Sequence, residues 1–262
     1  MSTTPFIERY GPWAIVAGAS EGLGASFAEA LAARKLNVVL VARRAELTET
    51  LAAKLRAAHG VETRVVGCDL SDAAFGDTLA QATRDLAVGL GVYNAAYSFV
   101  APLLDKPLGD ALRVVDVNVR GPLVFVHTFA PAMVTRGRGA IVLMSSLAGF
   151  QGSPKLAAYA SSKAFITTLA ESLWCELRPK GVDVLASCAG AIRTPGYARA
   201  LPKEAPGTLD ASEVAERTLA ALGHGPIVIP GGVNKLATFF LRRLLSRARA
   251  VGVMAKSVEG LE

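Results

Sequence analysis

The stretch from Trp13 to Gly24, WAIVAGASEGLG, decides the fold. It begins with an apolar run to Ala19, carries glycines at positions 18, 22 and 24, and then opens into a helical pattern. Glycine permits a tight turn and a close backbone approach, and a helix N-terminus offers unpaired N–H groups and a positive dipole end to a pyrophosphate. The stretch therefore predicts a strand, a phosphate-binding loop and a helix.

The same alternation of strand and helix continues along the chain. Further apolar runs predict strands at 37–43, 63–69, 88–96, 140–146, 182–189 and 226–231. Amphipathic stretches predict helices at 23–35, 45–59, 72–86, 110–135, 157–178, 212–222 and 235–255. Repeated β-α units with right-handed crossovers give a doubly wound sheet with a ligand crevice at the carboxyl ends of the strands. We predict an α/β protein of Rossmann type, with a seven-stranded parallel sheet in the order 3-2-1-4-5-6-7 and helices on both faces.

Composition favours one compact domain over residues 1–262. The chain is 52% hydrophobic and 19% charged, which suits a sheet buried on both faces. No apolar run reaches the roughly 18 residues of a membrane span, and the first ten residues lack the pattern of a leader, so we expect a soluble cytoplasmic protein. The three cysteines have no metal-type spacing, and the basic residues behind the net charge of +6 are mostly spread along the chain. We therefore expect no metal site and no nucleic-acid partner.

The end of the second predicted strand bears on the choice of cofactor. A protein that binds NAD normally carries Asp or Glu there, to bind the ribose 2′-hydroxyl. This chain has Ala42, Arg43 and Arg44, and guanidinium groups bind phosphate through charge-assisted hydrogen bonds. We predict NADP(H), with Arg43 as the main contact. Glu21 in the glycine loop argues against a phosphate nearby, and two solvated arginines at a helix start remain the alternative.

Tyr159 and Lys163 suggest proton transfer. Residues four apart lie on one face of a helix, and an ammonium beside a phenol stabilises the phenolate, which lowers the tyrosine pKa from about 10. Ser146 would hydrogen-bond a carbonyl or alcohol oxygen from the loop before this helix. Ordinary solvated helix faces produce the same spacing often, so the interpretation depends on the rest of the chain.

Several motifs in order resemble the single-domain branch of the short-chain dehydrogenase/reductase family, from about Trp13 to Gly231. The spacing G-x-x-x-G-x-G resembles the glycine motif of that family, and Tyr93-Asn94-Ala95-Ala96 resembles its Asn-Asn-Ala-Gly segment. The segment from Ala189 to Thr194 resembles Pro-Gly-x-x-x-Thr without its proline. The resemblance implies that the catalytic residues are Asn118, Ser146, Tyr159 and Lys163. It implies cofactor contacts at Gly18, Ser20, Glu21, Gly22, Leu23, Gly24, Arg43, Arg44, Asp69, Leu70, Asn94, Ala95, Ala96, Tyr159, Lys163, Ile192 and Thr194.

The reaction implied is hydride transfer between a nicotinamide and a carbonyl or secondary alcohol. Tyr159 would exchange a proton with the substrate oxygen, Ser146 would hydrogen-bond that oxygen, and Lys163 would pass protons through water organised by the backbone of Asn118. Reduction of a ketone or aldehyde is the expected direction with NADPH. The alternative from another class is a catalytically silent NADP-binding regulator. An epimerase or dehydratase would need an added substrate domain, for which the chain has no room.

Three segments would form the substrate pocket: 97–104, 148–156 and 190–210, the last a glycine- and proline-rich candidate lid. Their apolar side chains favour a bulky or apolar carbonyl compound, and they are Phe99, Val100, Leu103, Leu104, Phe150, Tyr197 and Leu201. The sequence of residues 233–255 predicts a basic amphipathic helix. This helix would cover the pocket, contact another subunit, or touch a membrane surface through residues 235–255. The resemblance implies a homodimer or homotetramer.

Overall fold

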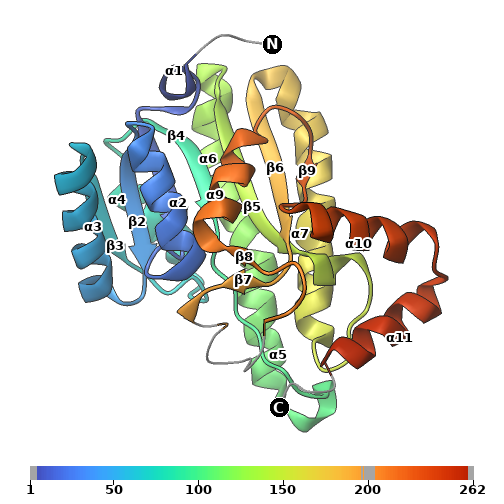
Figure 1. Ribbon diagram of the computed structural model, residues 1–262. Helices are drawn as coiled ribbons and strands as arrows, with labels where there is room; N and C mark the ends of the chain where they lie inside the picture. Colours follow the sequence, from blue (N-terminus) through green and yellow to red (C-terminus); the bar gives the residue numbers. More distant parts are fainter. Residues whose placement is uncertain (1–4, 196, 198–203, 259–262) are drawn as a thin grey trace.

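The computed structural model describes residues 5–195, 197 and 204–258, and a parallel seven-stranded sheet lies at the centre of this part (Figure 1). The strand order is β3-β2-β1-β4-β5-β6-β9, which confirms the predicted order. The strands are β1 Trp13–Ala17, β2 Asn37–Ala42, β3 Thr63–Gly67, β4 Val88–Tyr93, β5 Gly139–Ser146, β6 Val182–Ala189 and β9 Ile227–Val228. The seventh strand is shorter than predicted and pairs with β6 over two residues.

Helices cover both faces of the sheet. They are α1 Phe6–Tyr10, α2 Gly22–Ala33, α3 Ala45–His59, α4 Phe75–Ala82, α5 Leu108–Val115, α6 Gly121–Arg136, α7 Ala157–Leu177, α9 Ala211–Ala220, α10 Gly232–Arg243 and α11 Arg247–Val258. Short 3₁₀ turns lie at η1 Leu103–Asp105, η3 Leu147–Phe150 and η4 Arg178–Lys180, and a π turn at η2 Asp116–Arg120. The predicted helix at 72–86 is thus shorter, and α1 lies in a segment where no helix was predicted.

The alternation of side chains along β1 divides the core into two layers. Ala14 and Val16 belong to the layer packed under α2, α3 and α9, whereas Ile15 and Ala17 belong to the layer packed under α4, α6 and α7. Every residue of β1, β4 and β6 is buried, as expected for strands covered on both faces. The two layers fix the sheet rigidly, so its carboxyl-end edge can present loops in defined positions.

Two long predicted helices are divided in the structure. The helix predicted at 110–135 is interrupted by the π turn η2, where the side chain of Asn118 turns inward and is fully buried. Such single π turns often mark functional positions. The predicted C-terminal helix ends at Arg243 and restarts as α11 at Arg247, where Ser246 accepts a hydrogen bond from the Arg249 N–H as an N-terminal cap does.

The predicted lid forms a small structure of its own. Strands β7 Ile192–Arg193 and β8 Leu209–Asp210 pair in parallel beside the main sheet. Within the predicted lid, residue 196 and residues 198–203 lie outside the described residues, and these include Leu201 of the expected substrate pocket. Among the described residues, no helix is long and apolar enough to cross a membrane.

Candidate active site

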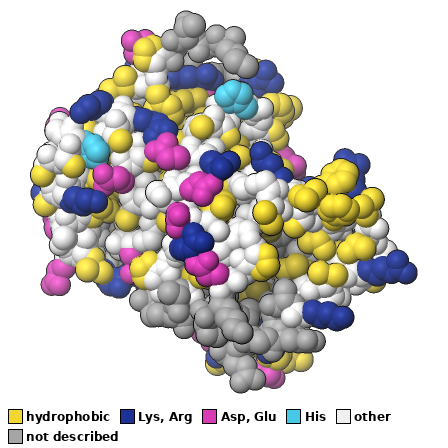
Figure 2. All heavy atoms as spheres, viewed as in Figure 1, with side chains coloured by type: hydrophobic (Ala, Val, Ile, Leu, Met, Phe, Trp, Pro, Cys, Tyr) yellow, Lys and Arg dark blue, Asp and Glu magenta, His cyan; other side chains and the backbone are white. Residues whose placement is uncertain are grey.

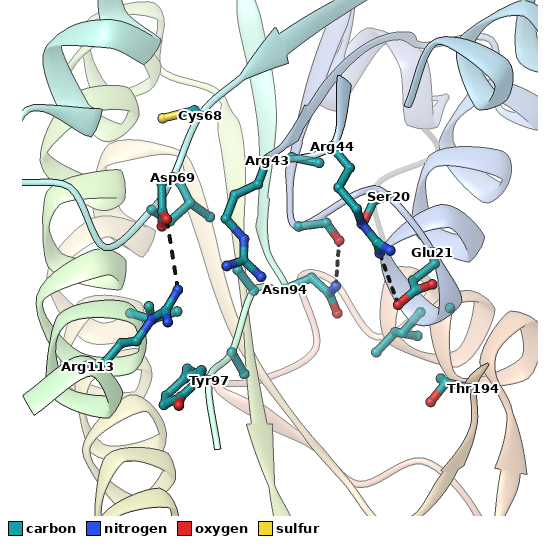
Figure 3. Close-up of a pocket in the computed structure, with 18 residues that line it drawn as sticks. Ser20, Glu21, Arg43, Arg44, Cys68, Asp69, Asn94, Tyr97, Arg113 and Thr194 are labelled. Carbon is teal, nitrogen blue, oxygen red and sulfur yellow. Dashed lines mark hydrogen bonds and ion pairs between the residues drawn. The ribbon is translucent and has the colours of Figure 1, made fainter. Parts of the chain in front are cut away.

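A pocket of about 400 Å³ lies at the carboxyl ends of β1, β2 and β4, where the strand order reverses (Figure 3). Such reversal points are the usual ligand sites of doubly wound sheets. Most of its lining residues are among the predicted cofactor contacts, namely Gly18, Ser20, Glu21, Gly22, Leu23, Arg43, Arg44, Asp69, Leu70, Asn94, Ala95, Ala96 and Thr194. The lining residues that the sequence did not indicate as cofactor contacts are Ala42, Cys68, Tyr97, Arg113 and Val117.

The glycine loop is held against the end of β4. Gly18 has a φ of +88°, and a Cβ on it would lie 2.8 Å from the Ala95 nitrogen. A Cβ on Gly24 would lie 1.8 Å from the Gly18 carbonyl oxygen. The Asn94 side-chain amide donates to that same oxygen at 2.9 Å. The loop therefore needs glycine at these positions, and its shape leaves the start of α2 facing the pocket, as a bound pyrophosphate requires.

The two arginines after β2 have different surroundings. Arg44 forms an ion pair with Glu21, with 3.2 Å between Nη2 and Oε1, so the Glu21 carboxylate in the pocket lining is directed at this guanidinium (Figure 3). Arg43 points into the pocket, where its charge helps to lower the pKa of Asp69, and it forms no hydrogen bond or close ion pair with the described residues. Arg43 is thus the guanidinium ready to bind an anion, and Arg44 is already partly neutralised.

The other end of the pocket is built by Asp69, Arg113 and Tyr97. The Asp69 carboxylate accepts hydrogen bonds from the N–H and hydroxyl of Ser71 at 3.0 and 2.8 Å, and the backbone bond is the main cause that lowers the Asp69 pKa. Arg113 of α5 lies 4.0 Å from that carboxylate, and its guanidinium is 4.8 Å from the centre of the Tyr97 ring. No local pattern marks Arg113 as a site residue, because only the packing of α5 brings it here.

Ser146 and Tyr159 meet at the end of β5. Burial is the larger influence on Tyr159 and raises its pKa, while the nearby Ser146 side chain acts in the opposite direction and favours the phenolate. The Ser146 oxygen also accepts from the Ala148 N–H at 3.2 Å. The structure thus brings together two of the four residues expected in catalysis. The expectation that Tyr159 has a lowered pKa is wrong for this arrangement, because burial opposes the charged form.

Lys163 lies one helical turn beyond Tyr159 but is directed at the backbone of β5. Its ammonium donates to the Met144 carbonyl oxygen at 2.7 Å and lies 5.5 Å from the centre of the Tyr159 ring. The side chain is buried, and this burial lowers the pKa of Lys163 to about 8. The ammonium therefore lies over the Tyr159 ring at a cation–π distance rather than bonding to the Tyr159 hydroxyl.

Ser145 has a structural role in the core, unlike the neighbouring Ser146. Its hydroxyl is buried, donates to the Lys163 carbonyl oxygen and hydrogen-bonds Thr167, both at 2.8 Å. Thr167 in turn lies 3.6 Å from the Cys188 sulfur. These bonds attach α7 to β5 and β6, so they hold the helix that carries Tyr159 and Lys163.

Asn118 connects two parts of the site through its side chain. Its oxygen accepts from the Tyr97 N–H at 2.8 Å, and its amide donates to the Tyr97 carbonyl at 2.9 Å and to the Ser162 hydroxyl at 3.0 Å. Ser162 then donates to the Tyr159 carbonyl oxygen at 2.7 Å. Asn118 therefore links the pocket wall at Tyr97 to the helix that carries Tyr159, whereas the proposed water at its backbone stays a prediction.

The segment after β6 contributes one residue to the pocket lining. Thr194 lines the pocket next to the glycine loop, because a Cβ on Gly22 would lie 3.0 Å from its methyl group. Ile192 lies in β7 and packs against the hydrophobic core. The predicted cofactor contacts outside the pocket lining are Gly24, Tyr159, Lys163 and Ile192.

The family model described as short chain dehydrogenase matches residues 12–205, which span the glycine loop, Ser146, Tyr159 and Lys163. The chain belongs to this family. Members are oxidoreductases that use a nicotinamide cofactor and act on hydroxyl or carbonyl groups, and the coarse function of this chain follows from that membership.

Relatives and solved structures agree with this short-chain dehydrogenase assignment. A 7beta-hydroxysteroid dehydrogenase of Collinsella aerofaciens is 34% identical over 234 residues, which are 87% of this chain and 89% of that protein. A structure that addresses 7beta-hydroxysteroid dehydrogenase stereoselectivity matches with a TM-score of 0.91 at 31% identity, over 96% of this chain and 99% of the other. A short-chain dehydrogenase from Sphingobium yanoikuyae in complex with NADPH matches with a TM-score of 0.76 at 28% identity, over 84% and 87% of the two chains.

Proposed function

We propose that this short-chain dehydrogenase is an NADP(H)-dependent reductase of bulky, apolar ketones or aldehydes, acting as a single domain in a homo-oligomer. The observation that carries the reaction is the proximity of the Ser146 and Tyr159 side chains at the end of β5, with Lys163 one turn away. A hydroxyl pair of this kind can hold one oxygen atom between two donors, which is what a carbonyl under reduction requires.

Each of these side chains has a role in the proposed reaction. NADPH, when bound, supplies the hydride for the carbonyl carbon. Tyr159 donates its proton to the developing alkoxide, and its raised pKa keeps it protonated at neutral pH for this purpose. Ser146 donates a hydrogen bond to the same oxygen. Lys163 is buried and largely charged at neutral pH, so it stabilises the phenolate left after proton transfer.

The cofactor assignment rests on the end of β2. Ala42 is followed by two arginines and no carboxylate, and Arg43 points into the pocket (Figure 3). A 2′-phosphate would give this guanidinium a charge-assisted hydrogen bond, which the 2′-hydroxyl of NAD would not provide. The NADPH complex of the Sphingobium protein supports the same choice.

The substrate assignment rests on the side chains around the expected pocket. Phe99, Val100 and Phe150 are half-buried apolar residues on two of the segments that we expect to form the pocket. Walls of this kind favour a large apolar body over a small charged one. The relatives named for hydroxysteroids support a rigid polycyclic ketone as the first compound to test.

Turnover with a ketone panel tests the reaction. The protein is mixed with NADPH and a set of steroid, aryl and small aliphatic ketones, and nicotinamide absorbance is followed. We expect consumption with the bulky ketones, and a loss of at least about 10³-fold in Tyr159→Phe with NADPH binding retained. Tight NADPH binding without turnover on the whole panel would instead favour the silent regulator.

Cofactor titration tests the choice of NADPH. Arg43→Ala should weaken NADPH binding by roughly tenfold or more, because a charge-assisted bond to phosphate is lost, and should leave NADH binding nearly unchanged. Arg84→Ala, an exposed arginine on the far side of the pocket-forming segments, is the matched control. Equal losses for both cofactors would contradict a contact with the 2′-phosphate.

A further inference from the structure

The last two helices carry a surface that the oxidoreductase reaction does not use. We call residues 232–258, which form α10 and α11, the C-terminal helix pair. Large apolar side chains on it are between 47% and 61% exposed, and they are Val233, Leu236, Phe239, Phe240, Leu244 and Val253. Figure 2 shows hydrophobic side chains gathered over this projecting part of the molecule, with Lys and Arg at its rim. Exposed apolar side chains this numerous on one short segment indicate an interaction surface.

The apolar side chains form one face of α10. Val233, Leu236, Phe240 and Leu244 follow the spacing that places residues on one side of a helix. The opposite side is already anchored to the domain. Asn234 is buried and donates to the Pro230 carbonyl at 3.0 Å and to the Gly207 carbonyl at 3.1 Å. The helix therefore cannot turn its apolar face inward without breaking these contacts.

The charged residues of the C-terminal helix pair are all basic. It holds six Lys and Arg and no Asp or Glu, and the only acids beyond it, Glu259 and Glu262, lie outside the described residues. The whole chain has 28 Lys and Arg against 22 Asp and Glu. The remaining 22 basic residues equal the 22 acidic ones, so the entire net charge of +6 is located in this pair.

A surface that combines exposed Phe and Leu with basic residues alone is complementary to an anionic lipid bilayer. Apolar side chains enter the boundary between headgroups and acyl chains, while Lys and Arg are attracted to anionic headgroups. A second copy of the same face would bring like charges together at an interface without acidic partners, which is unfavourable. We propose that the C-terminal helix pair docks this protein on anionic membrane surfaces, without spanning them.

Docking there would place the active site near the bilayer. The Arg242 guanidinium of α10 lies 4.6 Å from the centre of the Phe150 ring, and Phe150 ends the η3 turn that begins directly after Ser146. The edge of the site next to Ser146 is thus in contact with the docking helix. An apolar substrate dissolved in the bilayer would need only a short path to it.

Vesicle flotation tests the proposal with the full-length protein. The vesicles are phosphatidylcholine alone or phosphatidylcholine mixed with phosphatidylglycerol, at low and at raised salt. We expect binding only to the mixed vesicles, with weakening as salt screens the charges. Arg243→Gln/Arg247→Gln should reduce the partition coefficient by about fivefold for each removed charge. Phe239→Ser/Phe240→Ser should reduce it more than tenfold, because both rings are removed from the boundary region.

Matched controls separate docking from general charge and hydrophobicity. Arg56→Gln/Arg84→Gln removes two exposed arginines elsewhere, and Leu47→Ser removes an exposed leucine of α3. Both should bind mixed vesicles nearly as the unchanged protein does, and circular dichroism and NADPH binding should be unchanged in every variant. Absence of binding to mixed vesicles at low salt would overturn the proposal. Vesicle binding by the Phe239→Ser/Phe240→Ser variant equal to that of the unchanged protein would also overturn it. A lower solution mass of this variant by light scattering would overturn it as well, because it would identify the face as a contact between copies of the chain.

Discussion

Replacing Lys163 by methionine should make the protein more stable at neutral pH while abolishing its reaction. Burial lowers the pKa of Lys163 to about 8 from an ordinary value near 10.5. Keeping the ammonium charged in these buried surroundings therefore costs roughly 3 kcal/mol of unfolding free energy. Removal of its charge-assisted hydrogen bond to the Met144 carbonyl should cost about 1.5 to 3 kcal/mol. Lys163→Met should therefore gain up to about 1.5 kcal/mol at pH 7.

The sign of the pH dependence provides the decisive test. The folded pKa is lower than the unfolded one, so the unfolded chain binds more protons between about pH 8 and 10.5, and the stability of the unchanged protein rises across that window. The advantage of Lys163→Met should be greatest below pH 8 and should disappear near pH 10.5. Urea unfolding at pH 7 and pH 10 measures both values, with Lys180→Met as the exposed control. A variant less stable than the unchanged protein at pH 7, or a difference independent of pH, would refute the reasoning.

Two further changes test the framework around the site. Gly24→Ala should destabilise the protein by about 3 kcal/mol or more and weaken cofactor binding, because its Cβ would lie 1.8 Å from the Gly18 carbonyl oxygen. Gly109→Ala in α5 is its control, with open space for a Cβ, and thermal unfolding of the two compares them. Tyr10→Phe should lower the unfolding free energy in urea by about 1.5 to 3 kcal/mol, because its hydroxyl donates at 2.6 Å to the buried Asp183 carboxylate; an unchanged midpoint would contradict this.

The sequence was sufficient for the sheet and the glycine loop because both depend on local patterns. Apolar runs between helical stretches predict parallel strands. The conformation of the loop between Gly18 and Gly24 is then determined by its glycines, because the loop must connect β1 directly to α2. Arg113 could not be predicted, since it reaches the pocket only through the packing of α5. The Glu21–Arg44 ion pair joins two loops whose side-chain directions the sequence does not determine.

The same limit explains the error about Tyr159. Spacing along α7 predicted an ammonium next to a phenol, but the pKa values depend on how much water the fold excludes and on what else the ammonium meets. The buried carbonyl of Met144 competes for Lys163, and no pattern within α7 contains that information. Burial raises the pKa of Tyr159 and its polar neighbours lower it, and the folded structure determines which of these two effects is larger.

The pH dependence of the two reaction directions follows from that balance. A tyrosine with a raised pKa is protonated at neutral pH, so it can act as an acid immediately, whereas oxidation of an alcohol first requires its phenolate. Lys163 loses its charge above about pH 8 and then no longer stabilises the phenolate, which works against the base form as the pH rises. We therefore expect ketone reduction to proceed near neutral pH with a decline above about pH 8. Alcohol oxidation should increase with pH only until the charge on Lys163 is lost, and a reductase whose rate instead rises steadily from pH 7 to 10 would show that Tyr159 is not the proton donor.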